Sequence, residues 1–184
     1  MDVQGYLVEK LSGQPFDEFL QERIFAPLDM VDTAFYVPAD KLDRLALIHG
    51  ENEDGTLTVQ QNGDPTQPPA GPSGGGGLYS TTLDYMRFSQ MVLNGGALDG
   101  VRLLAPRSVE MMRTNHLQEQ ALSTMAPGSG FGLDFGVVMD PAAAGDVLQG
   151  IVPVGRDRRH LVLDRSGRGL RVRWDDSAPR SCRS

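Results

Sequence analysis

The sequence contains very little of what disulfide-rich, metal-binding and membrane proteins need. A single cysteine, Cys182, excludes an internal disulfide framework. The three histidines, His49, His116 and His160, stand far apart with no second ligand near any of them, so we expect no metal and no cofactor. No apolar run approaches bilayer length, and the N-terminus lacks the pattern of a signal peptide. We therefore expect no membrane span and, for the chain as encoded, a cytoplasmic location.

What the sequence does contain is typical of an ordinary globular protein. Its 184 residues are 40% hydrophobic and 22% charged, which is enough apolar material for one domain with a buried core. Helical and strand patterns are mixed, without the regular strand–helix alternation of a parallel sheet. This predicts an α+β fold with an antiparallel sheet.

The helices are predicted from apolar stripes and from the residues at their ends. The strongest pattern runs from Thr81, a candidate N-cap, to Leu93, with Tyr85, Phe88, Met91 and Val92 on its buried face. Three further helices are expected: one with Val3, Tyr6, Leu7 and Leu11 on one face and ending at Gly13, one between Pro15 and Pro27, and one starting at Pro106.

Strands are predicted where apolar residues alternate. Residues 46–49 and 56–60 are expected to pair as a hairpin across the turn "ENEDG". The alternation through "FGLDFGVVM" predicts one strand over Phe131–Met139, buried on one face. Residues 62–77 are rich in proline and glycine, which forbid a continuous helix or ladder, and are expected to form a loop.

That loop contains two short motifs. "GPSGG" at 71–75 matches the nucleophile elbow, but Ser73 has neither the entering strand nor the departing helix that an elbow needs. "GGGG" at 74–77 lacks the lysine of a P-loop. It instead indicates a backbone that runs close to a ligand or a neighbouring segment, or that adopts positive φ. No Ser-x-x-Lys occurs in the sequence.

Three blocks in order carry a family resemblance: "GYLVEKLSGQPFDEFLQERIFAPLDMVDTAFYVP", "GPSGGGGLYSTTLDYMRFSQMVLNGGALDGVRLLAPRSVEMM" and "GSGFGLDFGVVMDP". Over about residues 1–150 the chain resembles the β-lactamase-related serine hydrolases, which include class C β-lactamase-like esterases and relatives of penicillin-binding proteins. The resemblance implies part of a β-lactamase/DD-peptidase-like fold. It also implies a small-molecule ester, β-lactam or peptide substrate, attacked through an acyl-enzyme.

The chain departs from the family pattern at every catalytic motif. The serine of Ser-x-x-Lys would lie upstream of Met1, and the family's tyrosine would sit just before "DVQGYLVEK". No catalytic residue can therefore be carried over. The resemblance assigns only Gly75, Gly76 and Gly77, as a segment that lines the substrate pocket. We expect residues 1–154 to be the central and C-terminal portion of such a domain, and the chain itself to be inactive.

The last thirty residues differ sharply in charge from the rest. Residues 1–154 carry 8 Lys+Arg and 20 Asp+Glu (8 − 20 = −12), whereas 155–184 carry 9 Arg and 4 Asp (9 − 4 = +5). One interpretation is a basic C-terminal arm of a nucleic-acid-binding protein. The other is a frameshift.

Several observations favour the frameshift. Codons read one nucleotide later from Val154 permit Trp-Gly-Gly, then Trp-Phe-Trp-Ile-Asp-Pro at 161–166 and Met-Thr-Gln at 175–177, the order expected in the related esterases. We therefore predict that 155–184 is an out-of-frame, disordered tail and that its charge does not indicate a nucleic-acid partner.

Overall fold

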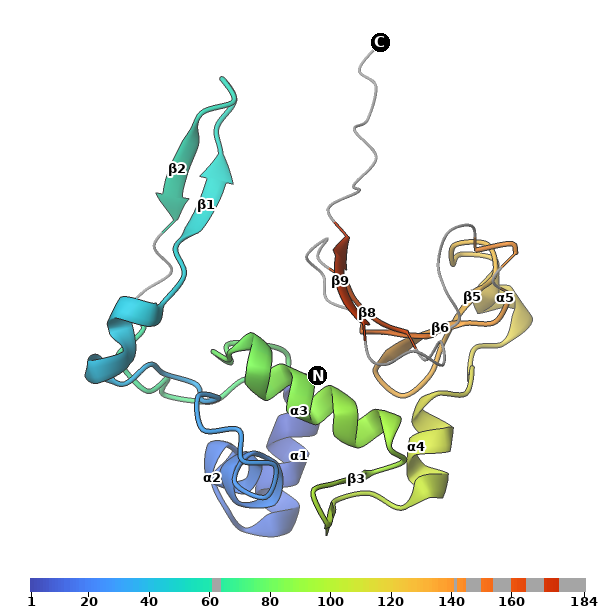
Figure 1. Cartoon of the computed structure of the whole chain (residues 1–184), viewed down its shortest axis with the longest axis horizontal. Coiled ribbons are helices and arrows are strands. Elements are labelled where there is room, and N and C mark those ends of the chain that lie inside the picture. Colours follow the sequence, from blue (N-terminus) through green and yellow to red (C-terminus); the bar gives the residue numbers. More distant parts are fainter. Residues whose placement is uncertain (61–63, 141, 145–149, 154–159, 165–170, 176–184) are drawn as a thin grey trace. The chain divides into compact units, whose positions relative to one another are not determined.

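The structure is a computed structural model that describes residues 1–60, 64–140, 142–144, 150–153, 160–164 and 171–175 (Figure 1). Its elements divide into two units, one formed by 1–90 with 98–103 and the other by 91–97 with 104–184. Helices and antiparallel strands are mixed, as the sequence predicted for an α+β fold. No helix in the described part of the chain has the length and apolarity needed to cross a bilayer.

The first unit begins with the two predicted helices. Helix α1 (Asp2–Ser12) ends at Gly13, whose φ of 72° gives the left-handed cap that glycine adopts without strain. Helix α2 (Phe16–Leu20) follows Pro15 and continues as the π-helix η1 (Gln21–Phe25). The core of this unit consists of the buried side chains of Phe25, Leu28, Met30, Phe35 and Val37.

The predicted hairpin is confirmed, with its first strand starting two residues later than the predicted 46–49. After the 3-10 helix η2 (Ala39–Arg44), strand β1 (Ile48–Glu51) pairs antiparallel with β2 (Leu57–Gln60). Asp54 closes the turn by accepting hydrogen bonds from the backbone and the hydroxyl of Thr56, at 2.9 and 2.6 Å. An aspartate that binds the backbone N–H two residues further on forms an Asx turn.

Helix α3 (Thr82–Leu93) begins as predicted and buries only part of the predicted face. The hydroxyl of Thr81 accepts the N–H of Asp84 at 3.2 Å, which makes Thr81 the N-cap. Val92 and Met91 are fully buried, yet Tyr85 is 36% exposed and Phe88 is half-buried. In the first turn the buried side chain is that of Asp84, which is 2% exposed, and the predicted face was therefore wrong at Tyr85.

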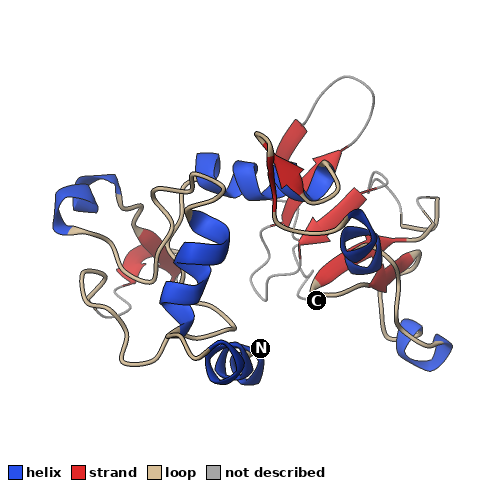
Figure 2. Ribbon diagram, turned by 90° about the horizontal axis from the view of Figure 1, so that it is seen from below, coloured by secondary structure: helices blue, strands red, loops and turns tan. Residues whose placement is uncertain are grey.

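The second unit contains helices α4 (Pro106–Met112) and α5 (Glu119–Leu122), and one antiparallel sheet (Figure 2). The first helix starts at Pro106, as predicted. A short pairing of β3 (Ala97–Leu98) with β4 (Val101–Arg102) comes before α4 in the sequence, and all of it except Ala97 belongs to the first unit. The sheet has the order β5-β6-β7-β8-β9, with strands β5 (Ser129–Phe131), β6 (Phe135–Val138), β7 (Gly150–Pro153), β8 (His160–Asp164) and β9 (Arg171–Asp175).

The prediction of a single strand over Phe131–Met139 was wrong. The chain reverses there, so that Phe131 pairs with Gly136, and the turn includes Asp134 at a φ of 62°. Of the alternating apolar residues only Phe135 is buried, whereas Leu133 and Met139 are 49% and 45% exposed. A hairpin with a short turn keeps the same alternation as a continuous strand, which is why the pattern did not reveal the reversal.

Two strands lie within the arginine-rich segment. The sequence predicted disorder over 155–184, but β8 pairs with β9 from His160 opposite Asp175 to Asp164 opposite Arg171. The remaining residues of this segment lie outside the described ones. Its out-of-frame origin stays a prediction.

Candidate glycine-loop site

The glycine loop, residues 73–77, packs against the start of helix α1. A Cβ added at Gly74 would lie 2.5 Å from the carbonyl oxygen of Met1 and 3.0 Å from the nitrogen of Gly5. Only a residue without a side chain allows this approach. Gly77 has a φ of 87°. The glycine run therefore has both features that the sequence predicted, a close backbone contact and a positive φ.

Ser73 is held by its neighbours in this loop. Its hydroxyl donates to a carboxylate oxygen of Asp2 at 2.5 Å and accepts the N–H of Gly75 at 3.0 Å. The hydrogen bond from Ser73, followed by those from the backbone of Gly75 and Gly74, holds the pKa of Asp2 below its ordinary value. An ionised carboxylate of low pKa is a weak general base, because a base works best when its pKa lies near the operating pH.

Ser73 is therefore bound as a structural hydroxyl. It lies in a turn with no strand before it and no helix directly after it, which agrees with the rejection of a nucleophile elbow. Neither of its two hydrogen-bond partners is a histidine or a lysine.

A cavity of about 390 Å³ opens beside the loop, and we call it the glycine-loop cavity. Gly76 and Gly77 line it, together with Ser73, Phe35 and Tyr79. Gly75, the third predicted pocket residue, is not among its lining residues and lies beside Asp2 instead. The role of all three glycines in substrate binding stays a prediction.

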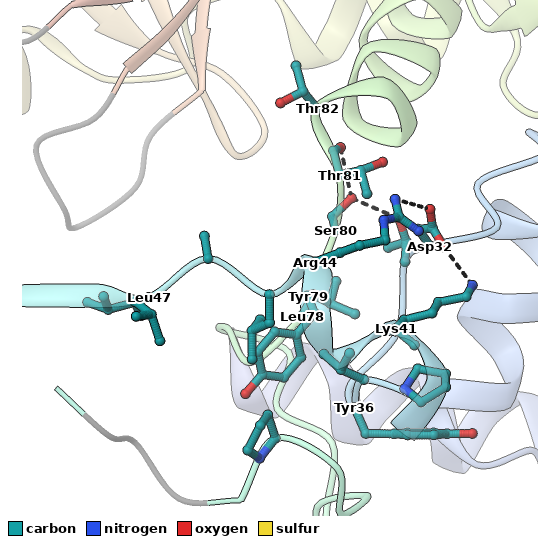
Figure 3. A pocket seen from close by; sticks show the side chains of 18 of the residues that line it. Asp32, Tyr36, Lys41, Arg44, Leu47, Leu78, Tyr79, Ser80, Thr81 and Thr82 are labelled. Carbon is teal, nitrogen blue, oxygen red and sulfur yellow. Dashed lines mark hydrogen bonds and ion pairs between the residues drawn. The ribbon is translucent and has the colours of Figure 1, made fainter. Parts of the chain in front are cut away.

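A larger cavity of about 930 Å³ lies on the same unit and shares Tyr79 and Pro65 with the first; we call it the hairpin cavity (Figure 3). Its walls are largely apolar, with Ile48 and Val59 contributed by the β1–β2 hairpin. Figure 3 shows Lys41 and Arg44 converging on Asp32. The nitrogens of these cations lie 2.6 and 2.8 Å from the two oxygens of that carboxylate.

A buried hydrogen-bond network joins the segment before the hairpin to helix α3. Asp84, only 2% exposed, accepts the N–H of Asp32 at 2.7 Å and the hydroxyl of Thr33 at 2.8 Å. The hydroxyl of Thr33 is also 2.8 Å from that of Ser80. Because buried polar groups are costly without partners, this network fixes Asp32, Thr33 and Ser80 in the wall of the hairpin cavity relative to helix α3.

Replacing Asp84 is expected to destabilise this unit. Asp84→Asn keeps an acceptor oxygen but loses the charge that strengthens both hydrogen bonds, so we expect a loss of about 1 kcal/mol in the free energy of unfolding. Urea unfolding measures it, with Glu53→Gln at the exposed hairpin turn as the matched control. Equal midpoints for the two variants would show that the network contributes nothing.

The cluster around Asp32 predicts a pH dependence. Hydrogen bonds from Arg44 and then Lys41 lower the pKa of Asp32 to about 2 from the ordinary 3.8. Stability from a lowered carboxyl pKa is present above 3.8 and is lost as the pH falls toward 2. The urea midpoints of the native chain and Asp32→Asn should thus differ at pH 5 and converge near pH 2. A constant difference over this range would contradict the assignment.

Sequence reasoning did not find Asp2, Asp32 or Asp84 as parts of this site. The spacing Thr81-x-x-Asp84 located the helix start, but the hydrogen bond from Ser73 to Asp2 joins residues 71 positions apart. No local pattern marks contacts of that range. Among the described residues, no group of three or more metal-ligating side chains comes together.

Comparison with known proteins identifies the family. The Beta-lactamase family model matches residues 1–155. Protein Rv1367c of Mycobacterium tuberculosis is 42% identical over 149 residues, which cover 77% of this chain and 37% of that protein. Lovastatin esterase of Penicillium rubens is 34% identical over 148 residues, with 77% and 36% covered. Unliganded simvastatin synthase (LovD) from Aspergillus terreus superposes with a TM-score of 0.70 at 26% identity, over 86% of this chain and 43% of that one.

These matches establish the fold of the chain and its family. The architecture is that of part of a β-lactamase/DD-peptidase fold. The chain belongs to the Beta-lactamase family of serine hydrolases. It spans about two-fifths of the length of the relatives it matches.

Proposed function

We propose that this chain supplies the glycine-loop wall of the substrate pocket in a serine hydrolase that cleaves esters, β-lactams or peptides through an acyl-enzyme. The observation that carries the proposal is the match of the family over residues 1–155, which includes the loop whose Gly76 and Gly77 line a cavity. The 184-residue chain alone is inactive in this proposal.

In this proposal the catalytic groups come from other parts of the enzyme, and this chain contributes only a pocket wall. Acyl transfer needs an activated nucleophile and donors aimed at the developing oxyanion. Ser73 has an ionised carboxylate as its partner, which holds the hydroxyl in place without accepting its proton efficiently. The described residues contribute the glycine loop, which packs against α1 and lies next to two cavities.

A protein extended upstream through Ser-x-x-Lys and the family tyrosine, and read in the shifted frame near Val154, tests the proposal. We expect it to hydrolyse a short-chain p-nitrophenyl ester and to be labelled at the serine of Ser-x-x-Lys by a phosphonate. Replacing that serine by alanine is the control and should abolish both. A folded extended protein without turnover or labelling would refute the proposed function.

A further inference from the structure

Two residues of the first unit, Tyr79 and Pro65, line both of its cavities, and no other described residue does so. We call these two side chains the partition. They lie where the glycine-loop cavity of about 390 Å³ meets the hairpin cavity of about 930 Å³, which is drawn in Figure 3. A tyrosine ring is large and rigid and a proline ring is fixed to its backbone, so both are suited to form a wall.

The backbone that carries the partition is held independently of its side chains. The N–H of Tyr79 donates to the carbonyl oxygen of Ala34 at 2.8 Å, and the N–H of Ala34 donates to the carbonyl oxygen of Tyr79 at 3.1 Å. The carbonyl oxygen of Pro65 accepts the N–H of Val37 at 2.8 Å. Backbone hydrogen bonds of this kind need no particular side chain, so we expect them to persist when the tyrosine is replaced by alanine.

The segment 34–37 that makes these hydrogen bonds lies between the two cavities. Phe35 is 7% exposed and lines the glycine-loop cavity, whereas Tyr36 and Val37 line the hairpin cavity. On the other side of the bridge, Gly77 lines the glycine-loop cavity and Leu78 the hairpin cavity. The two cavities therefore lie back to back on the same pair of backbone segments and meet at the partition.

This arrangement limits the reach of a linear apolar group that lies beside the glycine loop. Gly76 and Gly77 line only the smaller cavity, and Tyr79 stands between them and the apolar wall of the larger one. Each methylene that becomes buried in an apolar site strengthens binding by about fourfold, whereas a methylene left in water adds nothing. The partition thus determines how many methylenes of such a ligand become buried.

We infer that Tyr79 is the residue that sets the length of the apolar group accepted beside the glycine loop. The inference rests on the proposed function, because it takes the glycine loop as a wall of the substrate pocket. With tyrosine at this position, the apolar chain ends within the glycine-loop cavity. A smaller side chain joins the two cavities into one groove, in which a longer chain contacts the apolar wall of the hairpin cavity.

Binding to the 184-residue chain tests this role without any turnover. Methyl butanoate and methyl octanoate differ only in chain length, and each is titrated into the ¹⁵N-labelled native chain and Tyr79→Ala. The amides of Gly76 and Gly77 report the Kd at the glycine loop itself. In the native chain, methyl octanoate should bind there no more tightly than methyl butanoate. In Tyr79→Ala its Kd should fall by roughly tenfold or more, and the amides of Leu47 and Ile48 in the hairpin cavity should titrate with the same Kd.

Three further variants separate the size of the side chain from its other properties. Tyr79→Phe keeps the ring and loses the hydroxyl, so it should behave like the native chain. Tyr79→Leu fills part of the space and should give a smaller gain than alanine. Tyr36→Ala removes a tyrosine that is 40% exposed and lines only the hairpin cavity, so it should leave the preference for chain length unchanged. The Kd of methyl butanoate should stay the same in all variants.

The outcomes separate this inference from the proposed function. An unchanged preference for chain length in both Tyr79→Ala and Tyr79→Leu would overturn the inference. So would the same gain in Tyr36→Ala, or an absence of methyl ester binding at Gly76 and Gly77. None of these results depends on a nucleophile, whereas a folded extended protein without turnover overturns the proposed function and leaves the role of Tyr79 in binding intact.

Discussion

Purified and mixed with a short-chain p-nitrophenyl ester or a chromogenic cephalosporin, the 184-residue chain is expected to release product no faster than buffer does. The reason is the state of Ser73, whose hydroxyl donates to the ionised Asp2 and accepts from Gly75. Members of a catalytic unit act together, so a protein without its nucleophile falls short of the extended protein by roughly 10⁴-fold or more. Initial rates on both substrates measure this.

Covalent labelling gives a second, independent readout of the same prediction. A serine-reactive phosphonate should leave the intact mass of the chain unchanged, because the hydroxyl of Ser73 is bound only to the carboxylate of Asp2, whose lowered pKa makes it a weak base, and to the N–H of Gly75. The Ser73→Ala variant is the matched control and should behave like the native chain. Stoichiometric labelling that Ser73→Ala removes would contradict the prediction and make Ser73 a nucleophile.

Local sequence signals predicted those elements whose causes are local. Gly13 ends α1 because a residue at positive φ stops a helix, and Pro106 starts α4 because its missing N–H is not needed there. Thr81 caps α3, and the turn around Asp54 joins β1 to β2. In each case a few neighbouring residues determine the backbone, so the sequence alone is sufficient.

The misjudged elements have causes that the local pattern does not contain. Apolar alternation from Phe131 to Met139 is the same for a hairpin as for one strand, and the reversal depends on Asp134 at positive φ. On α3 the buried residue of the first turn is Asp84 and not Tyr85, and the partners of Asp84, Asp32 and Thr33, lie about fifty positions earlier in the chain. Tertiary hydrogen bonds overrode the hydrophobic pattern there.

In the candidate site, too, features with a local cause were predictable and long-range contacts were not. The glycine run predicted a close backbone contact before any contact was known, because few other features require four glycines in a row. The partner in that contact, the start of α1 at Met1 and Gly5, was not predictable from spacing. Nor were the carboxylate of Asp2, which binds Ser73, and that of Asp32, which binds Lys41 and Arg44.

The glycine contact leads to the second prediction with a large effect, a comparison of two neighbouring Gly→Ala substitutions. In Gly74→Ala, the new Cβ would lie 2.5 Å from the backbone oxygen of Met1 and 3.2 Å from the Cα of Gly5. Both contacts are backbone atoms that no rotamer change can move. We expect a loss of about 3 kcal/mol in the free energy of unfolding, at the upper end of ordinary overpacking.

Gly76→Ala is the matched control for this prediction. No atom lies within 4 Å of a Cβ built at Gly76, and its φ is not positive. Without strain, alanine reduces the conformational entropy of the unfolded chain, so this variant should be as stable as the native chain or more stable by about 0.4–1 kcal/mol. Urea unfolding midpoints measure both variants, and the amide shift of Gly5 reports whether α1 has separated from the loop. Equal stability of the two variants, with an unchanged Gly5 amide, would show that the glycine loop does not pack against α1. Contacts other than those with α1 would then have to hold Ser73 and the wall of the glycine-loop cavity in place.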